Sequence, residues 1–199
     1  MIVQGTPVTT KAGDIPVEQL KVGDSVLTYE SGFQPIKWIG TTTIVLQGFD
    51  DDLAPIRLEQ DAMGRGQPGQ AILVSPAHRV FWSGSTAQAL FGKKRVLVPA
   101  KYMINGTTVQ RDISRGRITY RHILFDGHKL LFSSGLKSES YFPSIHDATA
   151  SAMETRQELL RLFPELKDVG RNYARKTAPP ALRAYEYRPG TPKMADRCS

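Results

Sequence analysis

Residues 71–82 read AILVSPAHRVFW, and this stretch sets the expected fold. The apolar run 71–74 is typical of a short buried strand. Pro76 interrupts it, because proline has no N–H to donate to a strand ladder, and the apolar pattern resumes at 79–82. Two short strands therefore meet at a bend, and the bend carries two polar side chains, Ser75 and His78.

The same pattern of short, β-branched runs separated by turn residues covers residues 1–145. Two dipeptides, Asn105-Gly106 and Asp126-Gly127, are typical of tight hairpin turns. The second predicts that 118–125 and 129–132 pair as a hairpin. We expect further strands at 7–10, 25–29, 34–47, 54–58 and 96–98, and one helical turn at 99–103.

The pattern changes after Ser144. Apolar residues of 148–163 gather on one face of a helix, charged residues occupy the other, and Pro164 ends the helix. We therefore expect a mainly β protein. Its parts are a β domain at 1–145, a helical extension at 146–190 packed on that domain, and a flexible polar tail at 191–199.

Composition excludes several classes of protein. Apolar residues make up 40% and charged residues 23% of 199, as in ordinary globular proteins, and no apolar run is long enough for a membrane span. The N-terminus carries no signal-peptide pattern, so we expect a cytoplasmic protein, or a part of a longer and secreted one. The lone cysteine, Cys198, excludes a disulfide framework within the chain. The net charge of +7 leans toward 151–199, where a basic tail would attract an anionic partner.

Four histidines are available for chemistry: His78, His122, His128 and His146. Ser75 and His78 share the bend, where the pair either orients and protonates a peptide group or serves only as a turn cap and a core histidine. His122 and His128 flank the Asp126-Gly127 turn. If they lay on paired strands, they would hold zinc with His78 or a carboxylate as third ligand.

The order of several motifs along the chain is similar to that of a known family. These motifs are the opening at 5–8, the block 17–27, the block 75–80 around Ser75 and His78, and the block 120–136. Together they resemble the Hint domains of hedgehog proteins and inteins, which have a horseshoe-like all-β fold. The stretches 35–40, 97–100, 139–143 and 158–166 resemble a bacterial branch of that family.

The resemblance implies self-processing (autoproteolysis) by an acyl shift. A Cys or Ser at the first position attacks the preceding peptide carbonyl, and a second nucleophile resolves the thioester or ester. His78 would then protonate the departing amide nitrogen and Ser75 would hold the scissile carbonyl. His128 would assist resolution or fix the site, and His122 is a further candidate at the same place.

Two departures from the family pattern limit this chemistry. Inteins end in His-Asn, whereas 136–140 contains no Asn, so we expect cleavage at the N-terminal junction without splicing. Met1 occupies the nucleophile position, and a thioether has no proton to lose. Either Met1 replaces the catalytic cysteine of a protein that continues upstream, or the domain has lost its chemistry.

The expected partners follow from this reading. They are a polypeptide that flanks the N-terminus and a resolving nucleophile, which is water, a thiol, an amine or an alcohol. No cofactor is expected. Two alternatives remain: a non-catalytic module that binds a protein or an anionic partner, and a metal-dependent enzyme that uses His78, His122 and His128.

Overall fold

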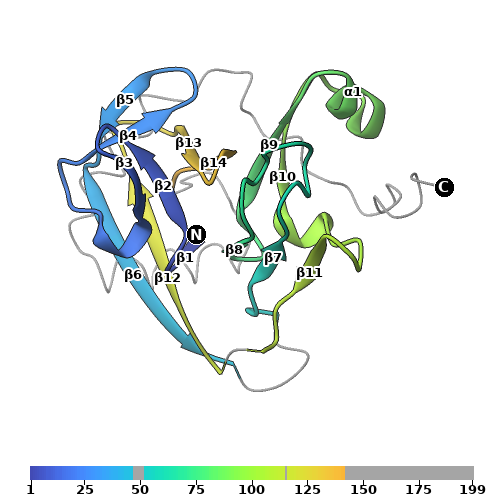
Figure 1. The fold of residues 1–199 in the computed structure, drawn as a ribbon, viewed down its shortest axis with the longest axis horizontal. Helices are drawn as coiled ribbons and strands as arrows, with labels where there is room; N and C mark the ends of the chain where they lie inside the picture. Colours follow the sequence, from blue (N-terminus) through green and yellow to red (C-terminus); the bar gives the residue numbers. More distant parts are fainter. Residues whose placement is uncertain (47–51, 115, 142–199) are drawn as a thin grey trace, which may run out of the picture.

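A computed structural model describes residues 1–46, 52–114 and 116–141 of the chain. This part is mainly β, as expected, and its strands form two antiparallel sheets (Figure 1). The helix expected at 148–163 and the tail at 191–199 lie outside the described residues. Within the described ranges, no helix has the length and apolar character needed to cross a membrane.

The first sheet has six strands and holds the N-terminus at its centre. Its order is β11-β7-β8-β1-β12-β6. The strands are β1 (Ile2–Val3), β6 (Trp38–Val45), β7 (Ile56–Leu58), β8 (Ile72–Val74), β11 (Val109–Arg111) and β12 (Arg117–Leu124).

The second sheet has eight strands, with the order β10-β9-β14-β13-β2-β4-β5 and β3 paired to β2. The strands are β2 (Pro7–Thr10), β3 (Gly13–Pro16), β4 (Ser25–Thr28), β5 (Gly32–Pro35), β9 (Arg79–Ser83), β10 (Arg95–Pro99), β13 (Leu130–Ser133) and β14 (Leu136–Glu139). The chain passes from the first sheet to the second at 75–78, between β8 and β9, which places the predicted bend at a junction of the sheets.

Short helical segments connect some of the strands. The 3-10 helix η2 (Ala100–Tyr102) confirms the turn expected at 99–103, and a second 3-10 helix, η1 (Val17–Gln19), precedes β4. The α-helix α1 (Ser85–Phe91) was not expected from the sequence. It ends at Gly92, whose φ of 68° is left-handed and suits a residue without Cβ.

Two apolar clusters form most of the core. One gathers around β7 to β11 and α1, and contains Trp82, Met103 and Leu136. The other lies among β1, β2, β4 and β12, and contains Ile2 and Phe125. In Figure 1 these groups of elements form two lobes, and β1, β8 and β14 lie where the lobes meet.

Both hairpin predictions were wrong. β12 pairs with β1 and β6, whereas β13 pairs with β14, β2 and β4, so Asp126-Gly127 carries the chain from one sheet to the other. At Asn105, the side-chain Oδ1 accepts N–H groups from Thr107, Thr108 and Val109, and the following strand pairs with the distant β7. A turn dipeptide fixes the local direction of the chain, but it does not fix which strand the chain meets next.

Candidate functional site

The first residues of the chain are held firmly in the six-stranded sheet. Ile2 lies opposite Val74 of β8 and opposite Arg121 of β12, and Val3 lies opposite Tyr120. Ile2 and Val3 are 2% and 3% exposed. Because strands pair with β1 on both sides, the backbone at residue 1 is fixed relative to the rest of the domain.

The bend between β8 and β9 meets the backbone of Met1. The α-amine nitrogen of Met1 lies 2.7 Å from His78 Nδ1. The backbone N–H of Ser75 donates to the carbonyl oxygen of Met1 at 3.0 Å, and the N–H of His78 donates to the carbonyl of Ser75 at 2.9 Å. The sequence therefore predicted correctly that Ser75 and His78 share a bend, and the structure places that bend against residue 1.

The polar side chains of this bend are buried. Ser75 and His78 are each 2% exposed. Among the described residues, neither Ser75 Oγ nor His78 Nε2 has a hydrogen-bond partner. Buried hydroxyl and imidazole groups are usually satisfied, so these two unpartnered atoms distinguish the bend from an ordinary turn in the core.

Burial controls the charge of these groups. It lowers the pKa of the Met1 α-amine to about 5, although the negative charge of Glu139 acts in the opposite direction. Burial also holds the pKa of His78 well below its ordinary value, and repulsion from Arg79 and from the protonated form of the α-amine adds to this effect. Both groups are therefore neutral near pH 7.

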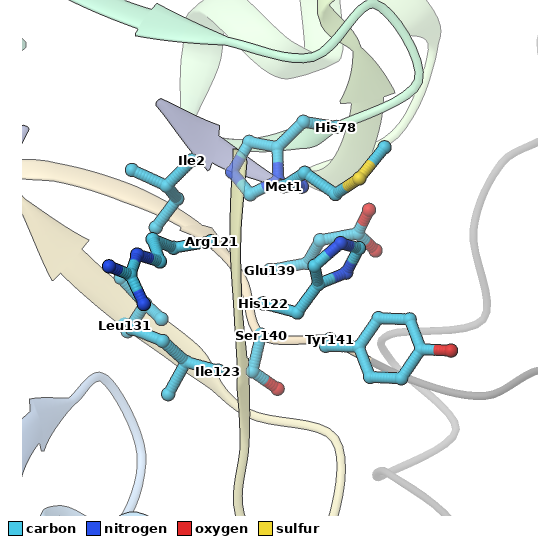
Figure 2. A pocket seen from close by; sticks show the side chains of 10 residues that line it. All are labelled: Met1, Ile2, His78, Arg121, His122, Ile123, Leu131, Glu139, Ser140 and Tyr141. Carbon is cyan, nitrogen blue, oxygen red and sulfur yellow. The ribbon is translucent and has the colours of Figure 1, made fainter. Parts of the chain in front are cut away.

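A small cavity adjoins the amine of Met1 (Figure 2). Its polar lining includes His78, His122, Glu139 and Tyr141. Ile2, Ile123 and Leu131 form part of its apolar lining. It has room for about one water molecule.

His122 reaches this cavity from β12. It is 4% exposed, and its Nε2 lies 3.2 Å from Thr42 Oγ1 of β6. Its ring packs edge-on against Tyr141, with 5.1 Å between centroids, and lies 6.4 Å from the ring of Trp38. In the described part of the chain, His122 Nδ1 has no hydrogen-bond partner. Burial and the nearby α-amine lower the pKa of His122 to about 3.

Gly40 makes room for this aromatic packing. It lies opposite His122 in the register of β6 and β12. A Cβ on Gly40 would stand 2.1 Å from an atom of the Trp38 ring. The absence of a side chain at Gly40 therefore lets Trp38 lie across the sheet toward His122 and Tyr141.

His128 lies beside Glu139. Its Nε2 is 3.5 Å from Glu139 Oε2, and the same carboxylate accepts the backbone N–H of Arg79 at 3.0 Å. Glu139 lines the cavity, whereas His128 is not among its lining residues. The expectation that His122 and His128 lie on paired strands was wrong, because His122 is in β12 whereas His128 lies in the connection to β13, a strand of the other sheet.

The structure does not bring the histidines together as a metal site. Within 1–46, 52–114 and 116–141, no three His, Cys, Asp or Glu side chains are grouped so as to hold a metal ion. His122 faces the cavity beside Met1, and His128 contacts a carboxylate instead. The zinc site proposed for His78, His122 and His128 is therefore not formed.

Three residues of the site were not predicted from the sequence as functional: Thr42, Glu139 and Tyr141. Glu139 and Tyr141 belong to a stretch that resembled the bacterial branch, but no spacing connects them to residue 1. Thr42 is one of three consecutive threonines, and only the pairing of β6 with β12 selects it. Their roles depend on contacts between distant strands.

The arrangement is suited to the chemistry of a peptide bond at residue 1. In a longer polypeptide, the α-amine nitrogen of Met1 would be the nitrogen of the preceding peptide bond. A neutral imidazole lies within hydrogen-bond distance of that nitrogen, and a buried hydroxyl lies in the same bend. A proton donor for a leaving nitrogen is a requirement of peptide-bond cleavage.

Comparisons with known proteins identify the family of the chain. A family model described as Hint domain matches residues 2–145. The solved structures that resemble the chain include the MchDnaB-1 intein, at 14% identity and a TM-score of 0.47, covering 71% of this chain and 100% of that one. The Msm DnaB1 intein splicing domain bound with zinc matches at 15% identity and 0.46, covering 69% and 98%.

A bacterial intein-like domain from Clostridium thermocellum matches at 12% identity and a TM-score of 0.44, covering 70% of this chain and 97% of that one. No curated protein matches the chain.

Proposed function

The chain belongs to the Hint domain family, and on that premise we propose that it is a self-processing module that acts on the peptide bond preceding residue 1. The reaction is an acyl shift from the nitrogen to the side chain of residue 1, followed by cleavage at this junction without splicing. The single observation that carries the proposal is the contact of 2.7 Å between the nitrogen of residue 1 and His78 Nδ1.

His78 is the proton donor for the departing nitrogen. An amide nitrogen is a poor leaving group, and protonation in the transition state contributes about 10²–10⁴-fold in rate. The low pKa of His78 keeps its ring neutral, so one ring nitrogen carries a hydrogen and the other is free to accept one. For this role Nδ1 carries the hydrogen, since Nδ1 faces residue 1.

Ser75 orients the scissile group. Its backbone N–H fixes the carbonyl of Met1, and its buried Oγ is available to donate to the carbonyl oxygen that precedes residue 1. A donor aimed at a developing oxyanion contributes about 10²–10³-fold.

Residue 1 supplies the nucleophile in this reaction, and Met1 does not meet that requirement. A thioether has no proton to release and forms no thiolate, so the chain with Met1 is inert in the first step. The partners of the active form are the polypeptide upstream of residue 1 and the nucleophile that resolves the acyl intermediate.

A cleavage assay tests the proposal. A short peptide and a tag are fused ahead of residues 1–199 carrying Met1→Cys, and cleavage with dithiothreitol or hydroxylamine is followed by mass spectrometry. We expect release at the junction, slowed at least about 100-fold by His78→Gln. The same fusion with Met1 is the matched control and stays intact. A folded Met1→Cys fusion that is not cleaved would contradict the proposal and would favour the non-catalytic binding module.

A further inference from the structure

The cavity beside Met1 contains a second histidine that the acyl shift does not use. His122 is 96% buried, lines the cavity, and leaves Nδ1 without a hydrogen-bond partner among the described residues. Met1 and His78 line the same cavity (Figure 2). His122 and the nitrogen of residue 1, where the acyl shift begins, thus line the same small cavity.

The free α-amine of Met1 corresponds to a group that the acyl intermediate also contains. An acyl shift converts the peptide nitrogen of residue 1 into a free amine and leaves the acyl group on the side chain of residue 1. The α-amine of Met1 held by His78 is therefore the same chemical group that the intermediate contains. The cavity beside it is the space that faces the intermediate when the second nucleophile attacks.

The cavity limits the size of a nucleophile that is held within it. It has room for about one water molecule, and the rings of His122 and Tyr141, with the carboxylate of Glu139, form part of its wall. A bulky alcohol such as a sterol does not fit this space as the described residues form it. Water is the nucleophile that matches its size and its polar lining.

From the buried Nδ1 and the size of the cavity, we infer that His122 is the general base for hydrolysis of the acyl intermediate by a water molecule in this cavity. The inference rests on the proposed acyl shift. The water oxygen bonds to the acyl carbon, and one water proton passes to His122 Nδ1. The bond between the acyl carbon and sulfur then breaks, and the leaving sulfur takes the proton from His122. The products are a free thiol and a carboxylic acid, which releases its proton to solvent.

Three neighbours hold His122 in the form that this step needs. Nδ1 accepts a proton only when Nε2 carries the ring hydrogen, and in that tautomer Thr42 Oγ1, at 3.2 Å from Nε2, accepts the hydrogen. The rings of Trp38 and Tyr141 pack against the imidazole and restrict its rotation. Thr42 is thus a positioning residue, acting through His122.

The test separates the two steps in the Met1→Cys fusion. Dithiothreitol attacks the thioester directly and reports the acyl shift, whereas release without added thiol reports hydrolysis. We expect His122→Gln and His122→Phe to keep the rate of dithiothreitol cleavage and to slow spontaneous hydrolysis at least about 100-fold. The Phe variant keeps an aromatic ring against Trp38 and Tyr141, and the Gln variant keeps a hydrogen-bonding group near Thr42.

Isotope labelling and a pair of threonine variants test the inference further. In water enriched in oxygen-18, the released peptide gains the heavy isotope at its new carboxylate. Thr42→Val slows hydrolysis, while Thr43→Val, which alters an exposed contact with Thr119 on the same strand pair, leaves it unchanged.

The outcomes that overturn the inference differ from those that overturn the acyl shift. Hydrolysis within threefold of the parent in both His122 variants excludes His122 as the base. Loss of dithiothreitol cleavage together with hydrolysis assigns His122 to the first step instead. Thiol-dependent cleavage without any spontaneous hydrolysis removes water as the nucleophile. Only the absence of all cleavage in a folded Met1→Cys fusion counts against the proposed function itself.

Discussion

Substituting Gly40 by alanine should disturb the site without touching any of its polar groups. The added Cβ would stand 2.1, 2.8 and 2.9 Å from three atoms of the Trp38 ring, where ordinary contact begins near 3.4 Å. The nearest ring atom must therefore retreat by about 1.3 Å, the difference between 3.4 and 2.1 Å. The Trp38 ring also packs against the rings of His122 and Tyr141, which restrict its movement.

Overpacking of this kind costs about 1–3 kcal/mol. For a chain of this length, each kcal/mol lowers Tm by about 2–4 °C, so we expect Gly40→Ala to lower Tm by roughly 2–12 °C. Urea denaturation gives the free energy of unfolding directly. The matched control is Gly116→Ala, because a Cβ at Gly116 meets no atom within 4 Å among the described residues. Its stability should stay within about 0.5 kcal/mol of the parent.

Nuclear magnetic resonance shows where the disturbance lies. The chain has two tryptophans, Trp38 and Trp82, and hence two indole N–H signals. Gly40→Ala should shift the signal of Trp38 and leave that of Trp82, which packs in the apolar cluster around β7 to β11 and α1. Equal stability of the two glycine variants, with an unmoved Trp38 signal, would refute the packing of Trp38 over Gly40.

Three further predictions concern stability and charge. Ile2→Ala should lower the free energy of unfolding, measured by urea denaturation, by about 2–5 kcal/mol, because the side chain is 2% exposed in a core cluster. The control Val45→Ala, at a position that is 62% exposed, should lower it by less than about 1 kcal/mol. Equal losses in the two variants would contradict the buried position of β1. The Met1 α-amine should titrate near pH 5 by nitrogen-15 NMR, and a value near 8 would show that it is solvated. The free energy of unfolding should decrease as the pH is lowered from 8 toward 3. The folded pKa of the amine is about 5, against an ordinary 8.0, and that of His122 is about 3, against 6.5. Between these values the unfolded chain binds more protons than the folded one, so lowering the pH favours unfolding. Urea midpoints at pH 8, 6.5 and 5 measure this pH dependence, and midpoints that do not change would exclude burial of the neutral groups. His122→Phe should reduce the pH dependence of the midpoint only below pH 6.5.

The sequence predicted the β class and the bend that carries Ser75 and His78, because both depend on local patterns. An apolar run broken by Pro76 has few interpretations, and the structure places its two polar residues together as expected. The ordered motifs indicated the family that the match over 2–145 then established.

The parts that were missed depend on contacts between distant strands. β1 has only two residues, too few for any periodicity, and pairing with β8 and β12 is what makes it a strand. The Asp126-Gly127 turn was identified, but the partner of the strand that follows it was not. Glu139 has no motif of its own, and it enters the site because β14 pairs with β9 beside His78. No window of local sequence contains these relationships.

The central place of β1 has a consequence for the timing of any reaction at residue 1. β1 is made before the other described strands, yet its two neighbours in the sheet belong to segments that follow tens of residues later. His78 is 77 positions away from the residue whose nitrogen it contacts, and His122 comes later still. Contacts of such long range form late in folding, because the loops between them must close first. An upstream segment would therefore stay attached until β12 had docked, and its release would report that this domain had finished folding.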